Sequence, residues 1–378
     1  MRPARSRRVP PLAAGAWALG ALLIAVLAWQ VARYRSSYGS MAGMHHHSTA
    51  DALYRAGDGP LGPLFGRALL TAWHLDAVAV ALLVLAAAWY LTGVALVPVR
   101  SPGRRWPLSR TLLFFAGLAV CAWATNGSVA VYDQALFTAH MVGHLALVML
   151  APALIMYGRP FGLAVAASAP AGRSRIERVL RGRVVSFVIA PPVALATYTA
   201  VIVGSHLTGV MDVVMRTTWA GQLEHLVYLV VGFQFFVLVV GDEPIRWRLS
   251  APARWLLLAV AMAVDTFTGI VLMQQTNPIA MLGAPGLTVN PIKDTHTGGA
   301  IMWFGGDAIM AAVMVVVVMA WLRQAEHQAD EPGWLEQARH AAFSEHTGGT
   351  AQPPEQFDED DAARASYNEW LGTLNRRR

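Results

Sequence analysis

The stretch Phe137–Pro160, FTAHMVGHLALVMLAPALIMYGRP, decides the fold class of this chain. It is long and apolar enough to cross the hydrocarbon core of a bilayer, which takes about 20 helical residues. It nevertheless contains two histidines, His140 and His144. A spacing of four places both imidazoles on one helix face. Because ionisable groups inside a membrane are costly, such a pair predicts a functional site, with packed or hydrogen-bonded core histidines as the alternative.

The composition of the whole chain agrees with a membrane protein. Of its 378 residues, 55% are hydrophobic and only 14% are charged, whereas soluble proteins carry about 25% charged residues. The single cysteine, Cys121, excludes an intramolecular disulfide and a Cys-x-x-Cys metal site. On a membrane protein the excess of basic residues bears on orientation before it suggests nucleic acid.

Eight segments have the length and composition of transmembrane helices, and no period-two pattern of membrane strands is found. We therefore expect an all-α polytopic membrane protein, a bundle of about eight transmembrane helices. The expected spans are residues 11–32, 74–97, 110–131, 135–158, 184–206, 219–241, 253–275 and 299–322.

Arginine placement predicts the direction of these spans. With the N-terminus in the cytoplasm, all but six of the 29 basic residues fall in cytoplasmic segments, as the positive-inside rule requires. Both ends of the chain are therefore expected to be cytoplasmic. The basic residues left on the outer side are Arg33, Arg35, Arg55, Arg67, Arg216 and Lys293.

The predicted organisation has five parts. The first span is expected to be an uncleaved anchor, with a cleaved signal peptide as the alternative. The C-terminal part is polar and acidic, which is typical of a largely disordered tail. The parts are a basic cytoplasmic N-terminus (1–10), the first anchor (11–32), an extracytoplasmic Met/His-containing segment (33–73), a membrane core of seven helices (74–323) and the cytoplasmic tail (324–378).

On this topology, six histidines from several spans lie toward the outer face of the membrane. One-sided imidazoles predict a shared metal or cofactor site, although each one taken singly is also explained as an interfacial residue. Nearby methionines, among them Met141 and Met302, add thioether groups, which together with imidazole suit Cu(I); simple packing is the alternative for each. The six histidines are His74, His140, His144, His206, His225 and His296.

The outer segment also contains a Met/His run, MAGMHHHS, at residues 41–48. Histidine-rich tracts bind metals by composition, so this run is a candidate metal collector, although too mobile for a catalytic centre. Its candidate ligands are Met44, His45, His46 and His47.

Three carboxylates are candidate partners of these ligands. Glu224 precedes His225, and Asp265 and Asp307 lie within predicted spans. A buried acid can orient a ligand histidine, relay protons or join two helices. For Asp265 we favour the structural role.

Three blocks of the chain resemble the CtaG family of cytochrome c oxidase assembly proteins. The resemblance covers roughly residues 74–330 and is closest to bacterial, actinobacterial-type members. The blocks are FTAHMVGHLALVMLAPALIMYGRP, then LEHLVYLVVGFQFFVLVVGDEPIRWRLS, then DTHTGGAIMWFGGDAIMAAV followed by WLRQAEHQADE.

The resemblance implies a role in the biogenesis of haem–copper oxidases in the bacterial plasma membrane, with copper, as Cu(I), supplied to the oxidase. The implied partners are a cytochrome c oxidase subunit, an extracytoplasmic copper donor and membrane lipid, without nucleic acid or enzymatic turnover. By motif, His140, Met141 and His144 are the first metal ligands, followed by His225 and His296. His74 and His206 rest on the topology alone.

Two other functions remain open from the residues. A membrane cytochrome with stacked haems would need histidines in both leaflets, and the inner halves of the spans have none, so only a single outer haem is left. A copper or proton transporter would need polar groups along its whole path, for which Asp265 and Asp307 are the available relay points.

Overall fold

The computed structural model describes residues 68–216, 218–241, 243–279 and 287–330, together with Leu64, Gly66 and single residues of the C-terminal tail. The chain divides into two compact units, Met1–Val317 and Val318–Arg378. The predicted first anchor, the Met44–His47 run and nearly all of the tail lie outside the described residues.

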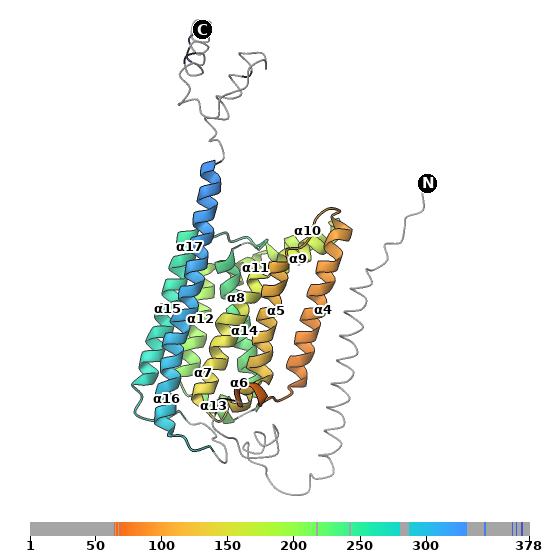
Figure 1. Cartoon of the computed structure of the whole chain (residues 1–378). Coiled ribbons are helices and arrows are strands. Elements are labelled where there is room, and N and C mark those ends of the chain that lie inside the picture. The colour runs from red at the N-terminus through yellow and green to blue at the C-terminus, as the bar shows by residue number, and fades with distance from the viewer. Residues whose placement is uncertain are drawn as a thin grey trace, which may run out of the picture. The chain divides into compact units, whose positions relative to one another are not determined.

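The described part of the first unit is a bundle of helices (Figure 1). Long helices run along the bundle, and short ones close its two ends. In chain order they are α3 (Ala68–Thr71), α4 (Ala77–Arg100), α5 (Leu108–Asn126), α6 (Ser128–Tyr132), α7 (Phe137–Leu145), η2 (Ala146–Leu150), α8 (Ala151–Tyr157), α9 (Pro160–Ala167), α10 (Pro170–Leu180), α11 (Arg183–Val188), α12 (Pro191–His206), α13 (Val210–Arg216), α14 (Thr218–Val240), α15 (Ala251–Met273), α16 (Pro291–Ala300), η3 (Ile301–Gly305) and α17 (Gly306–Asp330).

Within the described residues, six helical stretches are long and apolar enough to cross a membrane. Each corresponds to one of the eight predicted spans, so the chain is a multi-pass membrane protein with a helical fold. The six are Ala77–Arg100, Leu108–Tyr132, Phe137–Ala167, Ala220–Val240, Ala251–Met273 and Pro291–Ala325.

The predicted span 184–206 is divided between two helices. α11 ends at Val188, and the 16-residue α12 begins at Pro191. Ala190 is extended at the junction (φ −61°, ψ 136°), because a residue that precedes proline disfavours the helical conformation. The double proline therefore starts a new helix.

The stretch Phe137–Ala167 is the centre of the bundle. Of its most apolar 18 residues, 83% are buried, whereas only 17% of the corresponding residues of α4 are buried. Its middle, η2, is π-helical and lies just before Pro152, where the missing N–H interrupts the regular ladder. α14 approaches this point closely at Gly232, since a Cβ there would lie 2.3 Å from the carbonyl oxygen of Val148. Glycine is thus required for this helix contact.

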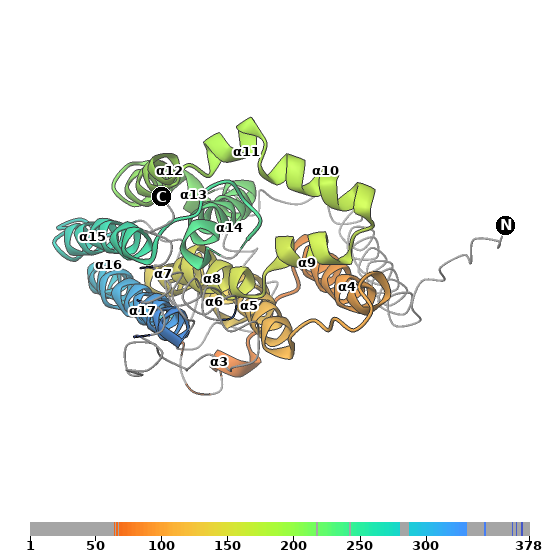
Figure 2. The same cartoon turned by 90° about the horizontal axis from the view of Figure 1, so that it is seen from above.

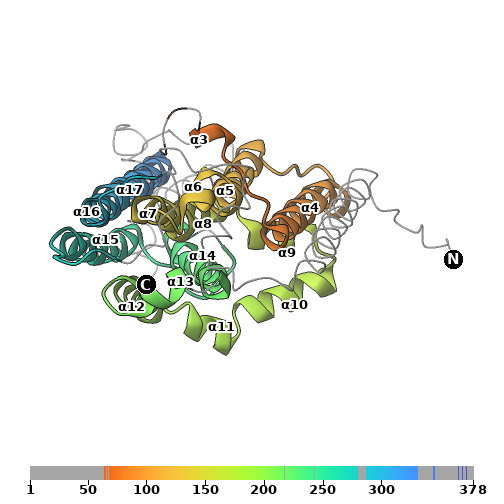
Figure 3. The ribbon, with the colours of Figure 1, turned by 90° about the horizontal axis from the view of Figure 1, so that it is seen from below.

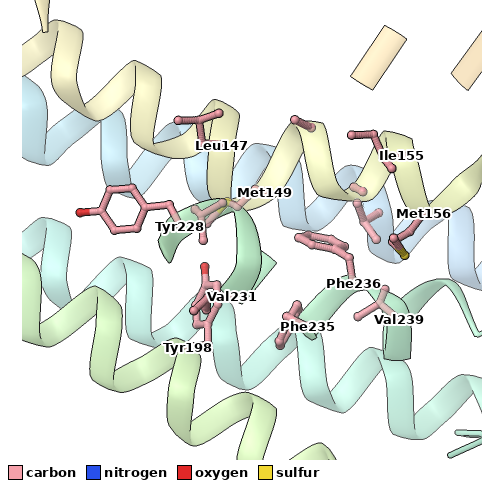
Figure 4. Close-up of a cluster of buried hydrophobic side chains, with 14 of the residues drawn as sticks. Leu147, Met149, Ile155, Met156, Tyr198, Tyr228, Val231, Phe235, Phe236 and Val239 are labelled. Carbon is pink, nitrogen blue, oxygen red and sulfur yellow. The ribbon is translucent and has the colours of Figure 1, made fainter. Parts of the chain in front are cut away.

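A second close contact joins α15 to α16. A Cβ on Gly269 would lie 2.8 Å from the carbonyl oxygen of Gly299, and a Cβ on Gly299 would lie 2.9 Å from that of Gly269. Around the centre, buried side chains of η2, α8, α12 and α14 fill the core (Figure 4). Tyr228 lies at one side of this cluster, with its hydroxyl pointing away from the other labelled side chains.

The two ends of the bundle carry different kinds of side chain. We call the end with α6, α7, α13 and the start of α16 the histidine end, because His140, His206 and His225 lie there (Figures 1 and 3). We call the opposite end, with α9, α10 and α11 at its edge, the arginine end, after Arg173 and Arg175 of α10 (Figure 2).

Candidate functional site

Four histidines meet at the histidine end, contributed by α7, α12 and α14. His140 and His144 lie one turn apart on α7, His206 is the last residue of α12, and His225 lies near the start of α14. The spacing of four had predicted a shared face for the first two. The end of α12 and the start of α14 lie at the same end of the bundle, where the short α13 joins the two helices (Figure 1).

Three of these rings form a compact buried cluster. His140 and His144 are each 1% exposed, and His206 is 4% exposed. The ring centroids of His144 and His206 are 4.7 Å apart, and those of His140 and His206 are 6.4 Å apart. The ring of Tyr228 packs edge-on against His144, with centroids 4.3 Å apart.

Hydrogen bonds at Nδ1 fix the tautomer of two rings. The Nδ1 atom of His140 lies 3.1 Å from Oδ1 of Asp133, and that of His206 lies 2.9 Å from the carbonyl oxygen of Ile202 and 2.8 Å from Oγ of Ser205. A carboxylate and a carbonyl only accept hydrogen bonds, so each Nδ1 carries the proton. In a neutral ring, the Nε2 lone pair is then available.

The remaining ring nitrogens have no hydrogen-bond partner within the described ranges. The buried nitrogens without a partner are Nε2 of His140, Nε2 of His206 and both ring nitrogens of His144. Buried polar atoms normally find a partner, and exceptions call for an explanation such as an ion or a catalytic role. Here four such nitrogens come from three rings of one cluster.

Two acids border the rings. Oε1 of Glu224 lies 3.8 Å from Nε2 of His140 and accepts a hydrogen bond from the hydroxyl of Tyr228, while its Oε2 is buried without a partner among the described residues. Oδ2 of Asp133 lies 3.8 Å from Nε2 of His225. Burial alone would raise the pKa of Asp133, but the imidazoles of His140 and His225 bring it below its usual range.

The first turn of α7 is held in place from another helix. The carboxylate of Asp294, on α16, accepts hydrogen bonds from the backbone N–H of Phe137 at 2.6 Å and of Thr138 at 3.2 Å. These are two of the N–H groups that a helix start leaves without an intrahelical partner. Asp294 therefore caps α7 and fixes the height of His140.

The rings resemble a metal site in their supporting contacts. A histidine ligand typically donates one ring N–H to a carboxylate or carbonyl and binds the ion with the other nitrogen, as Nδ1 and Nε2 of His140 and His206 are arranged. With ligand bonds of about 2 Å, rings that share an ion have centroids roughly 5–6.5 Å apart, close to the observed distances. Within the described residues, no three His, Cys, Asp or Glu side chains already form a metal-ready group, so binding requires the rings to turn.

Three predicted ligands lie outside this cluster. His74 is exposed just before α4. His296, on α16, is half-buried, and its Nε2 lies 2.9 Å from the carbonyl oxygen of Gln275. Met141 faces α16, since a Cβ on Gly298 would lie 3.1 Å from its Cγ. All three lie at the histidine end, but His74 is exposed, and the side chains of His296 and Met141 contact other groups.

Met302 and two predicted acids lie within membrane-spanning helices, but not in the ring cluster. Met302 is fully buried in η3. Asp265 accepts a hydrogen bond from the hydroxyl of Tyr198, and Asp307 accepts one from Thr266. Of the three predicted carboxylates, Glu224 alone contacts a histidine of the cluster.

Two residues of the site are absent from the sequence-based prediction. Asp133 lies in the turn between α6 and α7, and Tyr228 lies one turn after Glu224 on α14. The i, i+4 spacing of Glu224 and Tyr228 was a readable signal for their contact. The pairing of Asp133 with His140 and His225 depends on the turn that precedes α7, which the sequence pattern does not specify.

Comparison with known proteins assigns the chain to a family. Residues 88–324 match the family described as cytochrome c oxidase caa3 assembly factor (Caa3_CtaG). An uncharacterised protein of Mycobacterium bovis is 29% identical over 291 residues, which make up 74% of this chain and 43% of that protein. One of Mycobacterium leprae is 28% identical over 295 residues, 74% of this chain and 44% of that protein.

The chain therefore spans less than half the length of these curated relatives. No solved structure is significantly similar to it. The family match includes α7, α12 and α14, which together carry the clustered His140, His144 and His206 and the neighbouring His225. The chain belongs to the Caa3_CtaG family of cytochrome c oxidase assembly factors.

Proposed function

We propose that this protein supplies copper to a haem–copper cytochrome c oxidase during its assembly. Cu(I) is bound at the histidine end by His140, His144 and His206, and it leaves by ligand exchange to an oxidase subunit. The observation that carries this proposal is the set of buried imidazole nitrogens without hydrogen-bond partners among the described residues.

The charges of the site favour a monovalent cation. Three neutral imidazoles add no charge to Cu(I), and neutral nitrogen donors suit this soft ion. The adjacent Glu224 carboxylate has one buried oxygen without a partner in the described part of the chain. A cation near His140 Nε2 would offset this negative charge at low dielectric.

The rings differ in their surroundings, and we assign them different roles in binding and releasing the ion. Asp133, Ile202 and Ser205 hold the Nδ1 sides of His140 and His206, which leaves the buried Nε2 sides available to the ion. His144 has no such support within the described residues, and Tyr228 packs against its ring. We infer that His144 is the ligand that turns to admit or release the ion.

The expected route starts outside the cytoplasm. By the positive-inside rule, the arginine end faces the cytoplasm of a bacterial plasma membrane, and the histidine end faces outward. An extracytoplasmic donor would then deliver copper to the histidine end, with the Met44–His47 run as a collector. His225 pairs with Asp133 at the border of the cluster and is assigned to positioning rather than to the ion.

Copper binding by the purified full chain tests the proposal. His45, His46 and His47 are first replaced by alanine so that their copper does not obscure the membrane site. In this background, Cu(I) is titrated against a competing chelator. We expect one tightly bound ion, lost in the His140→Ala/His144→Ala variant and retained in the matched His74→Ala variant, whose ring is exposed at the same end.

Unchanged copper stoichiometry in the His140→Ala/His144→Ala variant would contradict the assignment of the site. The role in assembly has its own test, namely oxidase activity and oxidase copper content in a deletion strain. We expect an oxidase that is present but copper-poor and that added copper restores. A fully metallated oxidase in that strain would overturn the role in copper supply, whatever the purified protein binds.

A further inference from the structure

A second buried polar group lies in the membrane core and has no part in the copper proposal. Asp265, in the middle of α15, is 0% exposed. Its Oδ2 accepts a hydrogen bond of 2.8 Å from the hydroxyl of Tyr198 on α12. Its Oδ1 is buried without a hydrogen-bond partner within the described ranges.

The neighbours of Asp265 offer it no positive charge. From α12 it meets Tyr198, whose ring packs against Phe235 of α14 at 5.1 Å between centroids. From α17 it meets Gly306, where a Cβ would lie 3.7 Å from that of Asp265. Among the described residues, the charged side chain that acts on Asp265 is Asp307, a second acid.

An ionised Asp265 would therefore be an unpaired anion in a low-dielectric interior, beside a like charge. Such a group takes up a proton instead of remaining charged, because the desolvation cost falls on the ionised form. Protonation removes the negative charge from Oδ1, which has no donor within the described ranges to stabilise it as a carboxylate oxygen. Oδ2 keeps its hydrogen bond from Tyr198 in the protonated form.

We propose that Asp265 is a proton-binding site in the membrane core, occupied at neutral pH. The proton resides on Oδ1, and Oδ2 is the carbonyl oxygen that accepts the hydroxyl hydrogen of Tyr198. The site is independent of copper, since its contacts are with α12 and α17 rather than with the ring cluster.

Asp307 differs from Asp265 in its surroundings. It is half-buried, and the hydroxyl of Thr266 lies 3.0 and 3.1 Å from its two carboxylate oxygens. Asp265 is the fully enclosed acid of the two. The desolvation cost of an unpaired charge is therefore larger at Asp265, and the proposed proton is assigned to it.

Infrared spectroscopy of the full chain in lipid vesicles tests this directly. A protonated carboxyl has a carbonyl stretching band that carboxylates lack and that shifts to lower wavenumber in D2O. We expect such a band at pH 7, its loss in Asp265→Asn and its retention in Asp307→Asn. Removing the hydrogen bond to Oδ2 by Tyr198→Phe should move the band to higher wavenumber without abolishing it.

The Tyr198→Phe shift is specific to Asp265, so it separates this band from those of other buried acids, and it remains decisive if Asp265→Asn does not fold. A spectrum without any carboxyl band that responds to Tyr198→Phe would overturn the proposal. Loss of the band in Asp307→Asn would place the proton on the other acid and also overturn it. A band that appears only when sodium is withdrawn would assign the site to a metal cation instead.

Discussion

The two ends of the bundle hold their polar groups in opposite ways. At the histidine end, the rings of His140, His144 and His206 are enclosed, and several of their nitrogens have no partner among the described residues. At the arginine end, Arg173 and Arg175 are exposed on α10. The first arrangement suits the binding of an ion, and the second suits contact with water and lipid headgroups.

Two polar side chains packed at the arginine end, Tyr90 and Arg254, have structural partners. The hydroxyl of Tyr90 donates to the carbonyl oxygen of Gly158 at 2.8 Å and accepts from Nε1 of Trp106 at 2.9 Å. Nε of Arg254 donates to the carbonyl oxygen of Leu249 at 3.0 Å. These contacts close helix ends. Burial alone therefore does not mark a functional site, and the proposal for the histidine end depends on the missing partners as well.

The two ends are proposed to face opposite sides of the membrane, so a labelling experiment should give an all-or-none result. In a Cys121→Ser background, single cysteines are placed at exposed positions, Thr288→Cys at the histidine end and Ser174→Cys at the arginine end. In intact cells, a membrane-impermeant thiol reagent should label the first and not the second. Permeabilised cells serve as the control, because both should then react. Labelling of Ser174→Cys alone in intact cells would reverse the orientation.

Loss of a ring should produce the largest change in copper affinity. His206→Ala removes one of three proposed ligands, and we expect the affinity for Cu(I) to fall by at least about 100-fold, since even supporting residues are worth 10–100-fold. Chelator competition measures the change. The matched variant His296→Ala removes a ring that is hydrogen-bonded to the backbone of Gln275. It should change the affinity by less than about threefold. Equal losses of affinity in the two variants would contradict the assignment of His206, rather than His296, to the copper site.

Removal of a positioning acid should have an intermediate effect. Asp133→Ala frees the Nδ1 side of His140, and we expect the Cu(I) affinity to fall by about 10–100-fold. Asp76→Ala is the control: it deletes an acid at the same end that caps α4 through the N–H groups of Val78 and Ala79. If Asp76→Ala weakened copper binding as strongly, the effect would be one of general stability.

The two ends can also be compared through a pair of capping acids. Asp294 caps α7 at the histidine end, and Glu243 caps α9 at the arginine end through the N–H groups of Phe161 and Gly162. Each alanine variant should lose about 1–2 kcal/mol of unfolding free energy, measured by denaturant titration in micelles. Only Asp294→Ala should also weaken Cu(I) binding, because α7 carries proposed ligands and α9 does not. Weaker copper binding in Glu243→Ala would contradict the separation of the ends.

The smallest effect is expected at Tyr228. Tyr228→Phe removes the hydroxyl that donates to Glu224 but keeps the ring against His144. One hydrogen bond contributes about 0.5–1.5 kcal/mol, so the Cu(I) affinity should change by roughly 2- to 10-fold. Tyr228→Ala, which also removes the ring, should change it more. Identical behaviour of the two variants would show that the hydroxyl, rather than the ring, supports the site.

Long apolar segments made most of the fold predictable. Length and hydropathy identify six of the spans, because a bilayer imposes both. The same pattern missed the break before Pro191 and the π-helical segments η2 and η3. These depend on local steric conflicts and on close helix contacts, such as that at Gly232, which an apolar run does not reveal.

The sequence predicts at which end of the bundle the site residues lie, but not which way their side chains point. Sequence reasoning places His74, His206 and His296 at one end of the bundle, as the structure does. It does not fix the angle at which each residue leaves its helix, and only His206 points into the cluster. The partners that distinguish the rings, such as Asp133, come from turns whose shape depends on tertiary packing.

X-ray absorption at the copper edge tests the central claim most directly. The full chain carrying one Cu(I), with His45, His46 and His47 replaced by alanine, should show two or three imidazole nitrogens at about 2 Å, and one nitrogen fewer in His206→Ala. A copper environment made of sulfur alone, or one unchanged by His206→Ala, would contradict a copper site built from the buried rings of the histidine end.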